Sequence, residues 1–211
     1  MPINLVVLIS GSGSNLQAII DAIESGRLNA RISAVISNRV DAFGLERAKL
    51  HDIKTICIEH KNFTSRELFD QALQQEIASL TTDFIVMAGF MRILSAGFIK
   101  SFEHRMLNIH PSLLPKYQGL HTHQRALDNR DTEHGVSVHL VTEKLDDGPV
   151  LIQGKMNIST EDTVDTLASK AHLIEHQVYS QVLIWLAEKR LQIKNGIPFF
   201  DQKRLNEPLQ Y

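Results

Sequence analysis

The beginning of the chain decides the fold, because Ile3-Asn4-Leu5-Val6-Val7-Leu8-Ile9 runs directly into Ser10-Gly11-Ser12-Gly13-Ser14-Asn15. The first segment is almost continuously apolar, which is typical of a parallel strand buried on both faces. After the second segment, apolar residues recur at helical spacing from Leu16 to Ile23, and Gly26 favours an end to that helix. A strand, a glycine-containing turn and a helix together present backbone N–H groups to an anion, so we expect a phosphate to bind here.

This turn lacks the features of a dinucleotide or ATP site. Leu16 stands where the third glycine of a dinucleotide fingerprint would fall. The next strand, residues 32–37, ends in Asn38-Arg39 without an acid to bind a ribose, and a Walker-type lysine is missing. We therefore favour a phosphate monoester, with a tight turn that binds no ligand as the alternative.

Strand-like and helix-like segments keep alternating along the rest of the chain. We expect helices over residues 42–50, 65–80 and 162–187, strands over 54–58, 83–88, 135–141 and 149–156, and irregular structure over 196–211. The helix at 65–80 should turn Leu68, Phe69, Ala72, Leu73 and Ile77 inward. Repeated βα units favour an α/β fold: a Rossmann-like, doubly wound, mostly parallel sheet with a late antiparallel edge pair and a long C-terminal helix.

The composition narrows the class of protein. At 211 residues, 43% hydrophobic and 22% charged, the chain is typical of one soluble globular domain. Its net charge of −2 provides no field for wrapping nucleic acid or binding an anionic membrane. Cys57 is the only cysteine, and its apolar neighbours favour a buried thiol over a nucleophile. With neither a basic leader region nor a membrane-length apolar stretch, we expect a cytoplasmic protein.

A polar pair lies in Leu107-Asn108-Ile109-His110-Pro111-Ser112-Leu113-Leu114-Pro115, which has the character of a strand end followed by a stiff loop. Asn108 and His110 share one face of the strand, because side chains alternate faces. Pro111 favours an extended backbone at His110, which fixes the direction of the imidazole. The pair could stabilise an oxyanion and move a proton, and the alternative is a polar strand end with a satisfied histidine.

Other segments are less specific. In Gly89-Phe90-Met91-Arg92-Ile93-Leu94, apolar side chains surround one arginine, which fits either a packed helix start or a pocket wall for a flat heteroaromatic ligand. The acids between residues 142 and 148 could be simple turn formers. Residues 116–123 suit a mobile loop at a ligand site. His121 and His123 could bind a metal, but no third ligand stands nearby, so we expect no metal site.

Four motifs occur in order along the chain: Ser10-Gly11-Ser12-Gly13-Ser14-Asn15-Leu16-Gln17, Ala88-Gly89-Phe90-Met91-Arg92-Ile93-Leu94, Asn108-Ile109-His110-Pro111-Ser112-Leu113-Leu114-Pro115 and Leu145-Asp146-Asp147-Gly148-Pro149. Together they closely resemble the phosphoribosylglycinamide formyltransferases, folate-dependent enzymes of purine synthesis. The resemblance spans residue 3 to about residue 190. It implies a formyltransferase domain over residues 1–190, followed by a C-terminal tail over 191–211 that packs on or extends from it.

The resemblance also implies a reaction and the residues that serve it. The formyl group of 10-formyltetrahydrofolate, the cosubstrate, would pass to the amine of glycinamide ribonucleotide, without a metal. The implied catalytic residues are Asn108, His110 and Asp146, and the implied ribonucleotide-binding residues are Gly13, Ser14, Asn15 and Glu175. The implied folate-binding residues are Arg66, Met91, Arg92, Ile93, Leu94, Asn108, Thr142, Glu143, Lys144 and Leu145.

The chemistry agrees with the polar pair found independently. Asn108 and protonated His110 could stabilise the tetrahedral oxyanion, and Asp146 would favour the charged imidazole and so raise its pKa. Two residues depart from the family pattern: Gln118 stands where many members have proline, and Asp147 fills a position that is often glycine. Both lie in loops, so the departures concern loop rigidity rather than the reaction.

Three alternatives are open at this point. A methionyl-tRNA formyltransferase would need an additional C-terminal RNA-binding domain, and a formyltetrahydrofolate hydrolase an additional N-terminal regulatory domain. The third is a non-catalytic folate-binding module, which the intact catalytic trio disfavours. We expect small-molecule partners only, no nucleic acid and no membrane, with the chain acting as a monomer or a homodimer.

Overall fold

The computed structural model describes residues 1–211 and divides into two compact units, Met1–Leu107 and Asn108–Tyr211. The expected division into a formyltransferase domain over 1–190 and a tail over 191–211 stays a prediction.

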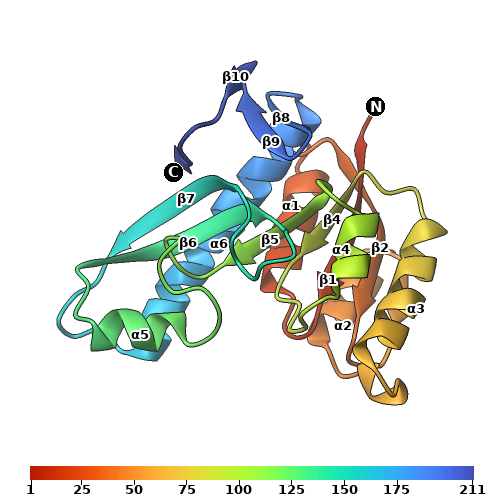
Figure 1. Ribbon diagram of the computed structural model, residues 1–211, viewed down its shortest axis with the longest axis horizontal. Coiled ribbons are helices and arrows are strands. Elements are labelled where there is room, and N and C mark those ends of the chain that lie inside the picture. Colours follow the sequence, from red (N-terminus) through yellow and green to blue (C-terminus); the bar gives the residue numbers. More distant parts are fainter. The chain divides into compact units, whose positions relative to one another are not determined.

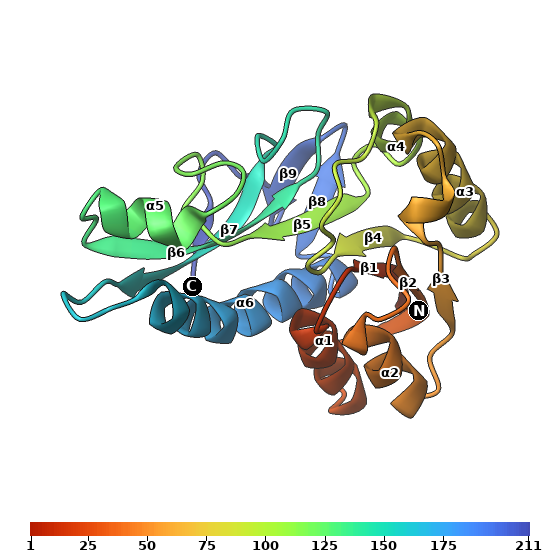
Figure 2. The same cartoon turned by 90° about the horizontal axis from the view of Figure 1, so that it is seen from below.

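The first unit alternates strands with helices (Figure 1). Its elements are β1 (Ile3–Ile9), α1 (Ser14–Glu24), β2 (Ala30–Ser37), α2 (Phe43–Leu50), β3 (Thr55–Cys57), a 3-10 turn (His60–Asn62), α3 (Arg66–Ala78), β4 (Phe84–Met87) and α4 (Ala96–Ser101). The strands pair in parallel in the order β4-β1-β2-β3. Figure 2 shows α1 and α2 on one face of these strands and α3 and α4 on the other, which is the doubly wound arrangement.

The position of β1 between two other strands explains why its side chains are buried. Leu5, Val6, Val7, Leu8 and Ile9 are all fully buried, because β1 lies between β2 and β4 and has helices on both faces. Strands in such a position have to be apolar on both sides.

Two apolar side chains lie further outside than expected. Cys57, expected to be a buried thiol, is exposed, because it ends the short edge strand β3. Partial burial and the nearby Glu59 raise the pKa of its thiol. Leu68, expected to face inward, is 47% exposed. The inward side of α3 instead runs through Phe69, Asp70, Leu73 and Ile77.

The second unit begins within β5 (Met106–His110). Its other elements are α5 (Thr122–Asp128), β6 (Glu133–Leu140), β7 (Val150–Asn157), α6 (Val164–Ala187), β8 (Leu191–Lys194), β9 (Ile197–Phe200), β10 (Lys203–Arg204) and β11 (Leu209–Gln210). As expected, β6 and β7 are antiparallel, and β11 adds a short parallel strand beside β7. Mostly parallel strands with alternating helices and the long helix α6 confirm the expected fold class.

Helix α6 packs closely on β6 and β7. It begins with a capping box in which the side chains of Thr163 and Thr166 each accept the other's backbone N–H. Gly154 of β7 permits the close approach, because a Cβ there would lie 2.2 Å from Cγ2 of Ile174. Strands β6 and β7 therefore pack closely against a helix whose N-terminus is capped.

The expectation of irregular structure over residues 196–211 is wrong. β8 and β9 form an antiparallel hairpin, and β10 extends it to a three-stranded sheet. The hairpin turns at Asn195 and Gly196, whose φ values are 50° and 76°. Asn-Gly between strands is the usual sequence signal for such a turn, so this hairpin could have been predicted.

A histidine pair in the second unit makes its stability sensitive to acid. Nδ1 of His123 lies 2.9 Å from Nε2 of His134, so the two rings share one hydrogen bond. Burial and the neighbouring His123 lower the pKa of His134 to about 4. In the unfolded chain the same histidine has its ordinary pKa of about 6.5, so it binds a proton more readily there than in the folded chain.

We expect the melting temperature to fall as the pH drops from about 6.5 toward about 4, because the contribution of neutral His134 is lost in that window. His134→Gln removes the titrating group, so its melting temperature should fall less between about pH 7 and pH 5. Thermal unfolding of both proteins across this range is the measurement. Equal losses in the two proteins would assign the acid sensitivity to other groups.

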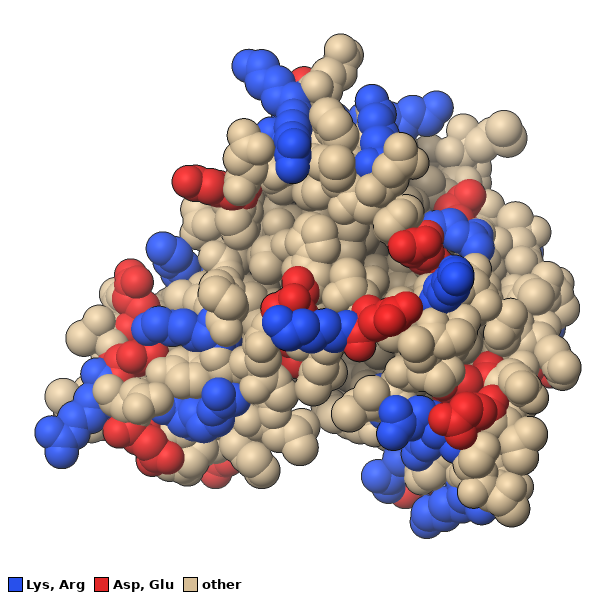
Figure 3. Space-filling view, in the orientation of Figure 1, with Lys and Arg blue, Asp and Glu red and all other residues tan.

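The surface shows no segregation of charge on the face that Figure 3 draws. Basic and acidic side chains are interspersed there rather than gathered by sign. None of the helices combines the length and the apolar character needed to cross a bilayer.

Candidate active site

His110 and Asp146 meet in the second unit, although they come from different segments. His110 ends β5 and Asp146 lies in the connection from β6 to β7. Nδ1 of His110 is 3.4 Å from Oδ2 of Asp146, and both side chains are more than nine-tenths buried. Nε2 of His110 donates a hydrogen bond of 2.8 Å to the carbonyl oxygen of Tyr117. The proton on Nε2 is thereby fixed, and Nδ1 is the nitrogen that can exchange a proton with the carboxylate.

The backbone around Asp146 is tightly constrained. Asp146 has a left-handed φ of 50°, which is uncommon for a residue with a side chain. Its Oδ2 accepts a 2.9 Å hydrogen bond from the N–H of Gly119. Two residues later, a Cβ on Gly148 would lie 1.8 Å from the carbonyl oxygen of Leu140, so only glycine fits there. This loop therefore presents the carboxylate in one defined orientation.

The electrostatics of the pair differ from expectation. The pKa of His110 was expected to rise because of Asp146, but it is lowered, since burial outweighs both the Tyr117 carbonyl and the Asp146 charge. Burial would also raise the pKa of Asp146, but the His139 imidazole, the Gly119 N–H and His110 together lower it. At neutral pH the resting pair is therefore an ionised carboxylate facing a mainly neutral imidazole.

His139 lies beside the candidate site residues, although the sequence analysis did not single it out. Its Nε2 lies 3.1 Å from Nδ2 of Asn108 and 3.6 Å from Oδ1 of Asp146, and the side chain is 2% exposed. Its Nδ1 donates to the carbonyl oxygen of Leu140. A signal was present, because a polar side chain at the end of a buried strand is unusual and His139 precedes the acidic connection.

The loop after His110 is held by a buried polar network. Ser137 Oγ accepts the N–H of Leu114 at 3.0 Å and donates to the carbonyl oxygen of Ser112 at 2.7 Å. Nε2 of Gln153 donates to the carbonyl oxygen of Leu114 at 2.8 Å. The backbone that follows His110 is therefore held by side chains of β6 and β7.

The other expected site residues of this unit are placed as follows. Glu175 is buried on α6, at 6% exposure. Thr142, Glu143, Lys144 and Leu145 form the outer part of the β6–β7 connection, where Leu145 is 50% exposed.

In the first unit, the expected phosphate turn lies between β1 and α1. Gly13 is the N-terminal cap of α1, with a left-handed φ of 71°, and Ser14 and Asn15 begin the helix. Neither a capping side chain nor an acidic residue occupies the first turn of α1. The N-terminus of the helix therefore keeps its affinity for an anion.

The expected folate segment of the same unit is fixed at both ends. The Met91 N–H donates to Ser10 Oγ at 2.8 Å, and the Ser95 N–H donates to Asp70 Oδ2 at 2.6 Å. Between these anchors, Met91 and Ile93 are exposed while Leu94 is buried. Exposed apolar side chains on a fixed segment favour a ligand-contacting wall over the start of a packed helix. Arg92 stacks on the Phe69 ring of α3, and Arg66 is exposed at the start of that helix.

His121, one of the two histidines that could bind a metal, is the N-terminal cap of α5. His123 is bonded to His134, and no group of three or more His, Cys, Asp or Glu side chains is arranged to hold a metal ion.

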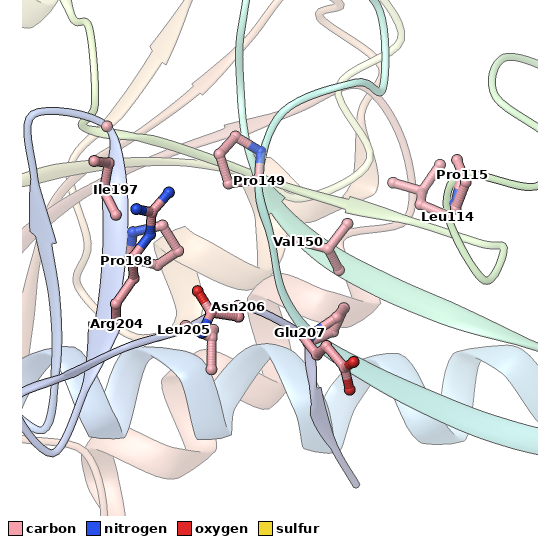
Figure 4. A pocket seen from close by; sticks show the side chains of 12 residues that line it. Leu114, Pro115, Pro149, Val150, Ile197, Pro198, Arg204, Leu205, Asn206 and Glu207 are labelled. Carbon is pink, nitrogen blue, oxygen red and sulfur yellow. The ribbon is translucent and has the colours of Figure 1, made fainter.

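A pocket of about 380 Å³ lies elsewhere in the second unit (Figure 4). Leu114, Pro115, Pro149 and Val150 form one part of its lining, and residues of β9 and the C-terminal segment form the rest. It contains none of the expected site residues.

Comparison with known proteins identifies the family. The formyl transferase family profile matches residues 3–183. The chain is 49% identical to phosphoribosylglycinamide formyltransferase of Escherichia coli K12, covering 96% of this chain and 95% of that one. The solved phosphoribosylglycinamide formyltransferase of Coxiella burnetii is 50% identical, covers all of both chains and has a TM-score of 0.95. Glycinamide ribonucleotide transformylase 1 of Symbiobacterium toebii is 38% identical over 94% of each chain, with a TM-score of 0.90. The motifs are thus those of a known family, and the chain belongs to the formyl transferases.

Proposed function

We propose that this enzyme transfers the formyl group of 10-formyltetrahydrofolate to the amine of glycinamide ribonucleotide, in purine biosynthesis. Membership of the formyl transferase family supports the transfer of a formyl group. The relatives that match over nearly the whole chain are named for this acceptor, which supports the choice of substrate. The buried His110–Asp146 pair, with Nδ1 and Oδ2 3.4 Å apart, supplies the proton-transfer chemistry that the reaction requires.

The proposed reaction begins with attack of the amine on the formyl carbonyl. Asn108 donates one amide N–H to the developing oxyanion, because a carboxamide has two N–H donors and only one faces His139. The attacking nitrogen becomes positively charged and has to lose a proton. Asp146 accepts it, directly or through water, since the lowered pKa keeps the carboxylate ionised.

His110 completes the proton transfer. Its Nδ1 faces the same carboxylate, so the proton can be shared with the imidazole on its way to the leaving nitrogen of the folate. Once that nitrogen is protonated, the tetrahedral intermediate collapses, the bond between the formyl carbon and the folate nitrogen breaks, and tetrahydrofolate leaves. A transiently charged His110 also stabilises the oxyanion at the moment when negative charge develops. Neither a covalent nucleophile nor a metal is part of this scheme.

The binding roles rest on the family resemblance, and the phosphate role rests also on the geometry of the α1 N-terminus. Gly13, Ser14 and Asn15 hold the phosphate of the ribonucleotide at the N-terminus of α1, and Glu175 receives the glycinamide amine. Arg66, Met91, Arg92, Ile93 and Leu94, together with Asn108 and residues 142–145, bind the folate.

One assay separates this proposal from its rivals. Tetrahydrofolate release is measured with and without glycinamide ribonucleotide. A transferase releases it only when the ribonucleotide is present, whereas a formyltetrahydrofolate hydrolase releases it in both cases. A non-catalytic folate-binding module releases it in neither, and calorimetry with the cosubstrate would then show binding alone.

A further inference from the structure

The two residues that we expect to depart from the family pattern contact each other. Gln118 belongs to the loop after β5 and Asp147 to the connection between β6 and β7. Nε2 of Gln118 donates a 3.1 Å hydrogen bond to Oδ1 of Asp147. Two separate departures therefore produce one interaction between two loops.

The same amide also holds the residue next to Asp147. Nε2 of Gln118 donates a 3.0 Å hydrogen bond to the backbone carbonyl oxygen of Asp146, while the N–H of Gly119 donates to the Asp146 carboxylate at 2.9 Å. Gln118 and Gly119 thus hold Asp146 at its backbone and at its side chain together. This matters because the left-handed backbone of Asp146, with φ at 50°, is disfavoured for a non-glycine residue.

Both partners are themselves restrained. Nη1 of Arg125 donates to the Gln118 carbonyl oxygen at 2.7 Å, and Nζ of Lys144 lies 2.8 Å from Oδ1 of Asp147. Hydrogen bonds from Lys144 and Gln118 lower the pKa of the Asp147 carboxyl, so this acceptor stays charged at neutral pH. Hydrogen bonds to a charged acceptor are stronger than those between neutral groups.

We propose that Gln118 and Asp147 form an interloop clamp that positions the Asp146 carboxylate against His110. The clamp restrains by hydrogen bonding a loop that a proline at position 118 would restrain through its fixed φ. This assignment rests on the proposed function, in which Asp146 accepts the proton. Neither clamp residue touches the reacting groups, and both act through Asp146.

The experiment is a double-mutant cycle in the full-length protein. Gln118→Ala should lower kcat about tenfold, the change expected from one or two lost hydrogen bonds, while the KM values of both substrates stay within about twofold. Asp147→Ala should lower kcat about threefold, because the bond from Gln118 to the Asp146 carbonyl survives. The double variant should resemble Gln118→Ala alone, since removing Gln118 already removes the contact with Asp147.

Two further variants show whether the effect is specific. Gln124→Ala removes another exposed glutamine–aspartate bond of the same unit, the 2.7 Å contact from Gln124 Nε2 to Asp128, and should behave as wild type. Gln118→Pro lacks the amide but restrains the backbone, and should retain more of kcat than Gln118→Ala does. A kcat of Gln118→Ala within about twofold of wild type, or single losses that simply multiply in the double variant, would overturn the clamp.

Hydrogen exchange tests the clamp without any turnover. The Gly119 amide, which donates to Asp146, should exchange about tenfold faster in Gln118→Ala and at the wild-type rate in Gln124→Ala. If the wild type fails to formylate glycinamide ribonucleotide, the proposed function fails, and this exchange comparison still decides whether the clamp exists. Unchanged exchange in Gln118→Ala would refute it.

Discussion

Asp146→Asn is expected to lower turnover by about 10²–10⁴, the range for loss of a positioned proton acceptor. The asparagine side chain can still accept the Gly119 N–H, which now donates to Asp146 Oδ2, so the loop should keep its conformation. What disappears is the charge that receives the proton of the attacking amine. Steady-state assays with both substrates should show the loss in kcat, with ribonucleotide affinity largely intact.

Histidine titration by NMR provides the control for this variant. Asp146 is one of the groups that hold the pKa of His110 up against burial. Removing its charge should therefore lower that pKa further below the ordinary value. Near-normal turnover together with an unmoved His110 titration would mean that Asp146 is only a turn former.

The second large effect is expected at the phosphate turn. Gly13 has a φ of 71°, and a Cβ there would lie 2.6 Å from the backbone Cα of Gly44. Because neither backbone can yield as a flexible side chain would, Gly13→Ala must displace the turn that begins α1. Ribonucleotide affinity should fall about 100-fold, roughly 2.7 kcal/mol, while the affinity for a folate analogue changes little. Calorimetry with each ligand measures both quantities.

Gly11→Ala is the matched control, two residues earlier in the same turn. A Cβ on Gly11 would meet nothing within 4 Å, and its φ is not in the left-handed range. This variant should bind both ligands as the wild type does. Equal losses of ribonucleotide and folate binding in Gly13→Ala would indicate general unfolding instead of a damaged phosphate turn.

Local sequence patterns predicted the fold class because the apolar residues in these patterns are the ones that the strands and helices bury. The apolar run of β1, the following glycine turn and the long stripe of α6 are each visible within a few residues. Alternation along β5 likewise placed Asn108 and His110 on one face. Leu68 shows the limit of such patterns, because it lies in the first turn of α3 beside the buried stripe and is 47% exposed.

The site was less predictable because its contacts join segments that are remote in sequence. His139 reaches Asn108 and Asp146 only once β5 and β6 are folded. The low pKa of His110 depends on how deeply the ring is buried, which no spacing of residues reveals. Gln118 and Asp147 are 29 residues apart in the sequence, and their contact depends on the backbone angles of two loops.

Tyr117 makes hydrogen bonds with its backbone and with its side chain, and the two serve different neighbours. Its backbone carbonyl accepts the proton on Nε2 of His110, while its phenol binds Asp131 at 2.8 Å and its ring lies under the Arg125 guanidinium. The carbonyl reaches His110 from a backbone with a left-handed φ of 57°. Evolution can therefore alter the aromatic ring without touching the imidazole, provided that the replacement tolerates the same dihedral angle. Asparagine and glycine meet that condition, whereas β-branched residues do not.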